Sequence, residues 1–368
     1  MKFEEKHIEN QSHFKGLKVN EGIAQPAPVS EDSVRRFLKK RRKTYTPDEY
    51  VAGILQGNIT LLSQAVTLVE SSKTEHQQIA QEIIKKCLPH SGNSVRVGIT
   101  GVPGVGKSTF IEALGSLIVR EGGKLAVLAI DPSSERSKGS ILGDKTRMEE
   151  LSGAPNAYIR PSPSAGSLGG VARKTRETVV LCEAAGFSTI FIETVGVGQS
   201  ETAVHSMTDF FLLLMLAGAG DELQGIKRGI MEMADVVAIN KADGNNREKA
   251  ELARIQYQNA LHLFPSKESG WEPQALTCSA YEKSGIREIW DTINRYRTQI
   301  QQNGFFETNR NAQARYWMFE SIDEQLRNSF YQNPAIKHKL AEMEEKVLKA
   351  EISSFTAAGQ LLNLYFKR

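Results

Sequence analysis

The sequence has little of what marks a secreted or membrane-spanning protein. Its 368 residues include three cysteines, Cys87, Cys182 and Cys278, which lie too far apart to form a C-x-x-C ligand pair or a disulfide framework. No apolar run reaches the length of a membrane-spanning helix, and the first residues, "MKFEEKHIEN", contain acids and no apolar segment of a signal or transit peptide. These absences predict a protein of a reducing compartment, the cytoplasm, with no membrane association.

An excess of charge of one sign is also lacking. The 46 basic and 43 acidic residues leave a formal net charge of +3, which favours no class of charged partner. The densest basic cluster, "RRFLKKRRK" at residues 35–43, contains one aromatic residue and no repeat. We therefore interpret it as a solvated helix or tail rather than a nucleic-acid-binding arm, and we expect no nucleic-acid partner.

The hydrophobic pattern divides the chain into four regions. Residues 1–45 are expected to form a mobile lead, and residues 46–93 a helical region that begins with a capping threonine and a proline. Between residues 94 and 304, short apolar runs are mostly separated by helical segments, which predicts an α/β fold with a doubly wound, mostly parallel sheet. Residues 305–368 show no strand pattern, and two amphipathic helices separated near Pro334 are expected there.

A phosphate-binding loop follows the first predicted strand. The strand "VRVGIT" runs directly into "GVPGVGKST", which fits G-x-x-x-x-G-K-[ST] and opens a helix, as in a P-loop NTPase. Glycines allow backbone N–H groups to face a phosphate chain, while Lys107 reaches the terminal phosphates and the Ser108 hydroxyl ligates Mg²⁺. The nucleotide-binding residues predicted here are Gly101, Val102, Pro103, Gly104, Val105, Gly106, Lys107, Ser108 and Thr109.

An acid ends a second apolar run, in the stretch "STIFIETVGVGQSE". A dinucleotide-binding G-x-G-x-x-G is a poor match, because Glu201 occupies the position of the third glycine. In P-loop folds an acid at the end of a neighbouring strand holds Mg²⁺, usually through water, and a nearby glycine contacts the γ-phosphate. We therefore assign Glu193 to the metal and Gly196 to the γ-phosphate, and interpret the stretch as a switch that orders when a third phosphate is present.

The residue that usually orients the attacking water is missing from its usual place. Many GTPases have glutamine directly after the γ-phosphate glycine, but Val197 stands there and Gln199 follows two residues later. Slow intrinsic hydrolysis is expected. Lys227, in "GAGDELQGIKRGI", is a cation that a rearranged loop could bring to the phosphates, or else a solvated helix lysine.

Two further acids are candidate metal ligands. Asp131 ends the apolar run "LAVLAID", and Asp144 lies in the segment "LGDKTRM". Each has a structural alternative, because Asp131 could cap the following turn and Asp144 the following helix. The pattern leaves open which of the two contacts Mg²⁺ directly.

Guanine recognition is predicted from "AINKAD", where another apolar run ends. In N-K-x-D the Asp243 carboxylate accepts from the guanine ring N–H and exocyclic amine, the Lys241 stem covers the ring, and Asn240 fixes the loop and the base. The next run ends in "TCSA", and Ser279 and Ala280 match an element whose backbone N–H reaches the guanine carbonyl oxygen. We therefore expect bound GTP or GDP with Mg²⁺.

From residue 46 to the C-terminus, the ordered motifs resemble one family. They are "GVPGVGKSTFIEALG", "AIDPSS", "GSILGDKTRM", "YIRPSPSAGSLGGVA", "IETVGVGQSE", "GAGDELQGIKRG" and "NKAD". In these motifs the chain resembles the MeaB family, which is called MMAA in animals and was long labelled as ArgK kinases. The members of this family are SIMIBI-class GTPases that chaperone adenosylcobalamin-dependent methylmalonyl-CoA mutase. In that family GTP binding and hydrolysis gate cofactor loading into the mutase and protect it from inactivation.

The resemblance also implies roles for regions and residues. It implies a helical N-terminal region, a GTPase core, a C-terminal extension that makes a homodimer, and an additional switch loop at residues 218–230 that contains Lys227. It assigns phosphate and Mg²⁺ to Lys107, Ser108, Asp131, Asp144 and Glu193, and guanine to Asn240 and Asp243. The terminal helices carry apolar residues that suit a second subunit or the chain's own core, namely Trp317, Phe319, Leu348, Leu361, Leu364 and Tyr365.

Three other functions share part of this pattern. A kinase would share the P-loop, but "NKAD" and the lack of an H-R-D-type loop speak against it. A metal-insertion GTPase of the same class would carry a Cys/His store, whereas the histidines and cysteines here are scattered. A scaffold that holds a nucleotide only for stability would show no GTP turnover. The client could also be a related cobalamin-dependent acyl-CoA mutase.

Overall fold

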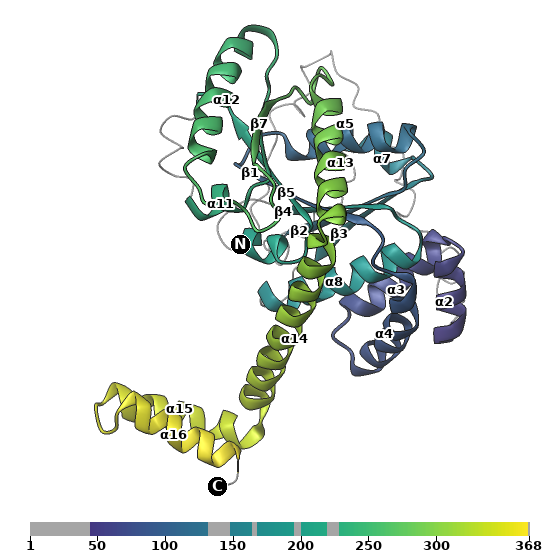
Figure 1. Cartoon of the computed structure of the whole chain (residues 1–368). Helices are drawn as coiled ribbons and strands as arrows, with labels where there is room; N and C mark the ends of the chain where they lie inside the picture. Colours follow the sequence, from purple (N-terminus) through teal and green to yellow (C-terminus); the bar gives the residue numbers. More distant parts are fainter. Residues whose placement is uncertain (1–44, 132–147, 164–167, 195–199, 219–227, 367–368) are drawn as a thin grey trace, which may run out of the picture. The chain divides into compact units, whose positions relative to one another are not determined.

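A single parallel sheet organises the chain (Figure 1). The structure is a computed structural model that describes residues 45–131, 148–163, 168–194, 200–218 and 228–366. The strand order is β3-β2-β4-β1-β5-β6-β7, and each neighbouring pair is parallel. The strands are β1 (Val95–Gly101), β2 (Leu125–Asp131), β3 (Ala157–Pro163), β4 (Thr189–Thr194), β5 (Phe210–Leu216), β6 (Val236–Asn240) and β7 (Gln274–Thr277). The predicted doubly wound α/β sheet is confirmed, and each apolar run quoted in the sequence analysis overlaps one strand.

Helices cover both faces of the sheet. On one face β1 and β5 pack against α5 (Lys107–Arg120) and α13 (Ile286–Gln302), and on the other β5 and β6 pack against α11 (Arg228–Met233) and α12 (Arg247–Leu261). The remaining helices beside the sheet are α7 (Glu149–Ser152), α8 (Leu168–Ala184), α9 (Ser200–His205) and the 3-10 helix η3 (Gly244–Asn246). Within the described ranges, none of the helices is long and apolar enough to cross a membrane.

The helical region before the sheet contains one more break than the hydrophobic pattern indicates. Thr46 caps the first helix as expected, since its hydroxyl accepts from the Glu49 N–H while the Glu49 carboxylate accepts from the Thr46 N–H. The apolar spacing after Thr46 suits one continuous helix, but that helix is interrupted at Gly57, with φ +74°, and Asn58 caps a new helix. The helices are α2 (Pro47–Leu55), α3 (Ile59–Glu70) and α4 (Thr74–Cys87), followed by the 3-10 helix η2 (Leu88–His90).

The chain after the sheet forms three helices rather than two. The break near Pro334 is confirmed, and Asn333 caps the helix that follows by accepting from the Ala335 N–H. The second expected helix is divided again, because Ala350 has φ 56° and Ser353 caps a third helix. The helices are α14 (Phe305–Gln332), α15 (Pro334–Leu348) and α16 (Ser354–Tyr365).

The sheet topology brings the predicted site residues to one edge. β1 lies between β4 and β5, and the P-loop leaves its carboxyl end. Glu193 near the end of β4 is in register with Ile99 of β1, and Asn240 ends β6 on the far side of β5. Because parallel strands end at the same edge, the point where the strand order reverses is the expected place for a ligand.

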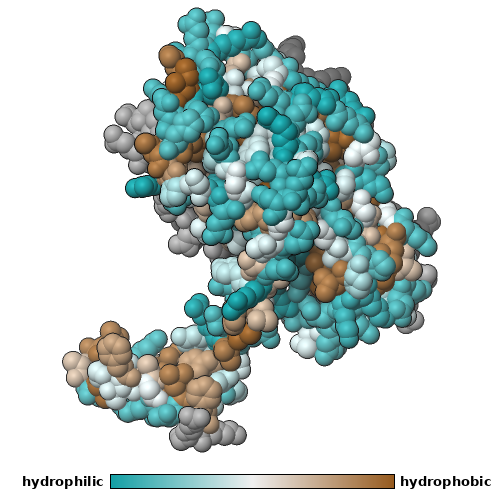
Figure 2. All heavy atoms as spheres, in the orientation of Figure 1, coloured by the Kyte–Doolittle hydropathy of each residue, from teal (hydrophilic) through white to brown (hydrophobic). Residues whose placement is uncertain are grey.

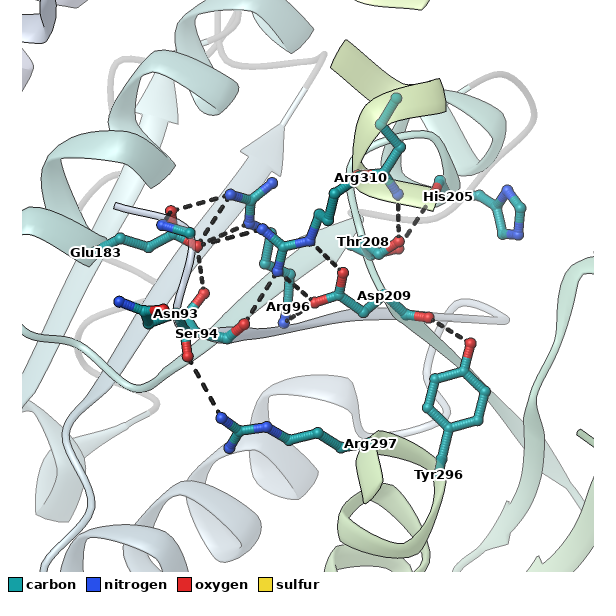
Figure 3. Close-up of polar contacts among 12 residues, drawn as sticks. Asn93, Ser94, Arg96, Glu183, His205, Thr208, Asp209, Tyr296, Arg297 and Arg310 are labelled. Carbon is teal, nitrogen blue, oxygen red and sulfur yellow. Dashed lines mark hydrogen bonds and ion pairs between the residues drawn. The ribbon is translucent and has the colours of Figure 1, made fainter. Parts of the chain in front are cut away.

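Four buried charges lie at the other edge, where β1 and β5 begin (Figure 3). The Arg96 guanidinium donates to both oxygens of Glu183 at 3.0 Å, and the Ser94 hydroxyl donates to the same carboxylate at 2.5 Å. Arg310 of α14 donates to Asp209 at 2.5 and 2.7 Å and lies 3.6 Å from Glu183. Two positive and two negative groups balance one another, so this cluster fastens α8 and α14 to the start of the sheet.

Glu183→Gln is expected to destabilise the chain in a pH-dependent way. Burial alone would raise the pKa of Glu183, but Arg96, Ser94 and Arg310 together hold it below its ordinary value. A lowered pKa stabilises the folded chain above about pH 4.3, the unfolded value, and that contribution is lost as the pH falls through the folded value. Removing one partner of a buried pair costs about 3–5 kcal/mol.

The measurement is the free energy of unfolding by urea at several pH values between 7 and 3. The deficit of Glu183→Gln should be largest at pH 7 and shrink below pH 4, while Glu272→Gln, at an exposed loop position, should match the unmodified chain. An equal deficit at all pH values would show that the Glu183 charge is not the cause.

Candidate functional site

The P-loop has the backbone conformation that its glycines allow. It connects β1 to α5, and Gly104 and Gly106 have φ of +76° and +93°. A Cβ on Gly106 would lie 3.1 Å from the Asn240 amide nitrogen, so space as well as φ favours glycine there. Val105 is fully buried between them and anchors the loop. The loop therefore wraps the N-terminus of α5, a fourteen-residue helix with a positive end.

Lys107 lies over the loop as the motif predicts. Its Nζ donates to the Gly101 carbonyl at 2.9 Å and to the Val102 carbonyl at 3.4 Å. Burial lowers the pKa of Lys107, and the carboxylates of Glu193 and Glu201 partly offset this effect. The ammonium group is thus held among loop carbonyls and acids, where a phosphate oxygen would stabilise its charge.

Two buried acids accompany Lys107, and only one of them was predicted. Glu193 is 6% exposed near the end of β4, and Glu201 is 5% exposed in the first turn of α9. The sequence analysis used Glu201 only to reject a dinucleotide motif. The sequence does contain a signal for Glu201, because an acid that opens a short helix after a strand and a loop can lie beside the acid that ends the strand. We conclude that Glu201 belongs to this site.

Of the other candidate metal ligands, the structure describes Ser108 and Asp131 but not Asp144. Ser108 lies in the first turn of α5 and is half-buried. Asp131 is the last residue of β2, which pairs with β4 beside Glu193. A hydroxyl and carboxylates are oxygen donors of the kind that Mg²⁺ prefers, so these residue types fit that ion. Three predicted site residues lie outside the described residues, namely Asp144, Gly196 and Lys227.

Asn240 joins the P-loop to the turn after β7. Its amide nitrogen donates to the Val105 carbonyl at 2.8 Å, and its amide oxygen accepts from the Ala280 N–H at 3.1 Å. The Cys278 thiol lies 3.6 Å from the same oxygen. Asn240 is 2% exposed, so its side chain connects two parts of the protein rather than pointing outward.

Asp243 is oriented by the same turn. The Ser279 hydroxyl donates to the Asp243 carboxylate at 2.5 Å, and Lys241 donates across the P-loop to the Gly104 carbonyl at 2.9 Å. The Ser279 N–H donates to the Ser284 carbonyl at 3.0 Å, and the Ala280 N–H to Asn240. The structure brings "NKAD" and "TCSA" together, and the contacts expected between these residues and guanine stay a prediction.

Asn240→Ala is expected to weaken nucleotide binding and stability together. The substitution removes the partners of the Val105 carbonyl and the Ala280 N–H, and an unsatisfied buried polar group costs about 1–3 kcal/mol. A fluorescent GDP analogue should bind roughly tenfold or more weakly, and the thermal unfolding midpoint should fall. Asn245→Ala, at an exposed position of η3, is the matched control. Unchanged GDP affinity in Asn240→Ala would contradict this role.

Comparison with known proteins identifies the family of the chain. Residues 62–335 match the family model described as methylmalonyl Co-A mutase-associated GTPase MeaB. The chain is 49% identical to the probable GTPase Rv1496 of Mycobacterium tuberculosis over 319 residues, which cover 87% of this chain and 95% of that protein. It is 44% identical over 331 residues, 87% of this chain and 80% of the other, to the mitochondrial methylmalonic aciduria type A homolog of Mus musculus.

A solved structure shares the fold. The crystal structure described as LAO/AO transport system kinase superposes with a TM-score of 0.69 at 38% identity, over 88% of this chain and 98% of that one. The family match and the named GTPase relatives show the family, and this solved structure shows the fold. The chain belongs to the MeaB family of P-loop GTPases.

Proposed function

We propose that this GTPase is a cytoplasmic chaperone that gates cofactor loading into methylmalonyl-CoA mutase, or a related cobalamin-dependent acyl-CoA mutase, and protects that enzyme. The observation that carries the proposal is the match of residues 62–335 to a mutase-associated GTPase family. The name of the mouse relative, which refers to methylmalonic aciduria, supports the same client. The site residues assigned from the sequence are proposed to supply the switch that such a role requires.

In the proposed mechanism, the P-loop binds the phosphates and Lys107 neutralises their terminal charge. Mg²⁺, held by Ser108 and by acids among Asp131, Asp144 and Glu193, would neutralise charge on the β- and γ-phosphate oxygens. Gly196 is assigned to the γ-phosphate as a backbone donor. Hydrolysis is expected to be slow in the isolated protein, because Val197 stands where a water-orienting glutamine is usual.

The remaining roles complete the switch. Lys227, or Gln199 in its place, is proposed to enter the phosphate site when a partner speeds hydrolysis. At the other end, Asp243 is proposed to accept from the guanine N–H groups, with its carboxylate oriented by the Ser279 hydroxyl at 2.5 Å. Asn240 is proposed to keep the base turn and the P-loop at a fixed separation through its hydrogen bonds to both.

Two rival functions fit the structure less well. A metal-insertion GTPase needs reactive thiols or imidazoles, but burial raises the pKa of Cys87 to about 11 and of Cys278 to about 12, and Cys182 is also buried. Among the described residues, no three His, Cys, Asp or Glu side chains are grouped to hold a metal ion. A kinase is disfavoured by the guanine-type turn at Asn240 and Asp243, which a kinase does not require.

Glu193→Gln is expected to reduce GTP turnover on the order of a hundredfold while changing GDP affinity little. The reason is that Glu193 is proposed to serve Mg²⁺ at the γ-phosphate end, and the amide keeps the size of the buried side chain. Phosphate release and GDP titration measure the two effects. Glu248→Gln, exposed in the first turn of α12, is the control. Equal loss of GDP affinity would indicate a damaged strand, and unchanged turnover would remove Glu193 from the site.

The C-terminal helices are proposed to form a homodimer. Figure 2 shows hydrophobic side chains gathered over α15 and α16. The apolar residues exposed there are Leu348 (86%), Phe355 (88%), Leu362 (46%), Leu364 (42%) and Phe366 (60%). Trp317 and Leu361, which from the sequence suit a second subunit or the chain's own core, are each 7% exposed and pack within the chain. A patch of exposed apolar residues on one hairpin is typical of a subunit interface.

Leu348→Glu/Phe355→Glu is expected to make the protein monomeric without changing nucleotide binding. The few residues that dominate an interface each contribute about 2 kcal/mol or more, and a buried charge opposes association. Light scattering after size exclusion measures the mass, with Leu263→Glu, at an 83% exposed position just after α12, as control. A monomeric unmodified chain would reject the dimer.

The proposed client is tested by measuring GTP turnover with and without a cobalamin-dependent acyl-CoA mutase. A turnover rate that no such mutase changes would reject the proposed client.

A further inference from the structure

One face of α14 holds the short connection between α9 and β5. The Trp317 indole N–H donates to the Ser206 carbonyl at 3.1 Å, and the Gln313 amide donates to the Thr208 carbonyl at 2.7 Å. Arg310 is paired with Asp209, the next residue along. The three side chains of α14 are spaced three and four residues apart, so they lie on one face of the helix. Together they contact nearly every residue of the connection.

These contacts are buried and mutually supported. Gln313 and Trp317 are the buried residues of α14, each 7% exposed. Arg176 of α8 donates to the Gln313 carbonyl at 2.9 Å, and Figure 3 shows Arg310 reaching between Glu183 and Asp209. The attachment is therefore well defined in position.

Gln313 also carries an unsatisfied group. Within the described residues its buried amide oxygen has no hydrogen-bond partner, although its amide nitrogen donates to Thr208. A buried acceptor without a partner is unfavourable for stability. A methionine of similar length would remove that penalty but would leave the Thr208 carbonyl without its donor.

The other end of α9 lies at the nucleotide site. The helix spans Ser200–His205, packs on β4 and β1, and carries Glu201, a buried acid whose charge raises the pKa of Lys107. Ser206 follows the last residue of this helix, so Glu201 and the point held by Trp317 are separated by little more than one helical turn. A helix that short moves as one body. The position of Glu201 therefore depends on where α14 holds Ser206 and Thr208.

We propose that Gln313 and Trp317 are positioning residues for GTP hydrolysis, which act through α9 and link the nucleotide site to the C-terminal helices. The proposal depends on the GTPase activity of the family and not on the client or on dimer formation. By reciprocity of linkage, a contact whose strength differs between nucleotide states must change nucleotide affinity when it is removed or when α14 is displaced. A displacement of the end of α14 that leads to α15 and α16 would therefore be transmitted through α9 to the nucleotide site.

The first test separates positioning from stability. Gln313→Met removes the donor to Thr208 and the unpaired oxygen together. The kcat for GTP should fall at least threefold with KM changed less than twofold, at a temperature where denaturation curves show both proteins fully folded. Gln325→Met, the same change at an exposed site on α14, should leave kcat unchanged. A kcat for Gln313→Met equal to that of the unmodified chain would overturn the proposal.

The second test asks whether the contact responds to the nucleotide. Tryptophan emission of the full chain should differ between the complexes with GDP and with a non-hydrolysable GTP analogue. That difference should disappear in Trp317→Phe, which keeps an aromatic ring but loses the N–H donor, and persist in Trp290→Phe, at a half-buried position on α13. A difference that survives in Trp317→Phe, or none in the unmodified chain, would overturn the proposal.

Discussion

The hydrogen bonds of the Asn240 side chain are the constraint on which the candidate site depends. One amide links the P-loop at Val105 with the turn at Ala280, and so sets the separation between the P-loop and the turn that is predicted to contact the base, which come from opposite ends of the domain sequence. The sheet order makes this possible, because β1, β5 and β6 are neighbours and end at one edge. Burial of Asn240 strengthens both bonds, since water does not compete for them.

The site's local elements could be predicted from the sequence because each has a local cause. The P-loop needs positive φ at Gly104 and Gly106, and the apolar runs specify buried parallel strands whose ends must converge. The same reasoning found Lys107 and the Asn240–Asp243 turn. It also found the family, whose motifs are ordered along most of the chain.

The rest depends on tertiary contacts that no local pattern encodes. Glu201 joins the site only because α9 packs on β4 and β1, and the breaks at Gly57 and Ala350 interrupt runs whose apolar spacing alone indicates continuous helices. Trp317 illustrates the same limit, since its apolar character fits either an interface or the chain's own core, and the contact with Ser206 decides for the core. Its hydrogen bond also shows that α14 belongs partly to the GTPase core.

The central claim is that Asn240 and Asp243 make this P-loop protein specific for guanine nucleotides. Calorimetric titration of the full-length protein with GDP, GTP and ATP in the presence of Mg²⁺ tests it most directly. Two lost hydrogen bonds to the base predict that ATP binds roughly a hundredfold or more weakly than GTP. Equal affinity for ATP and GTP would contradict the account.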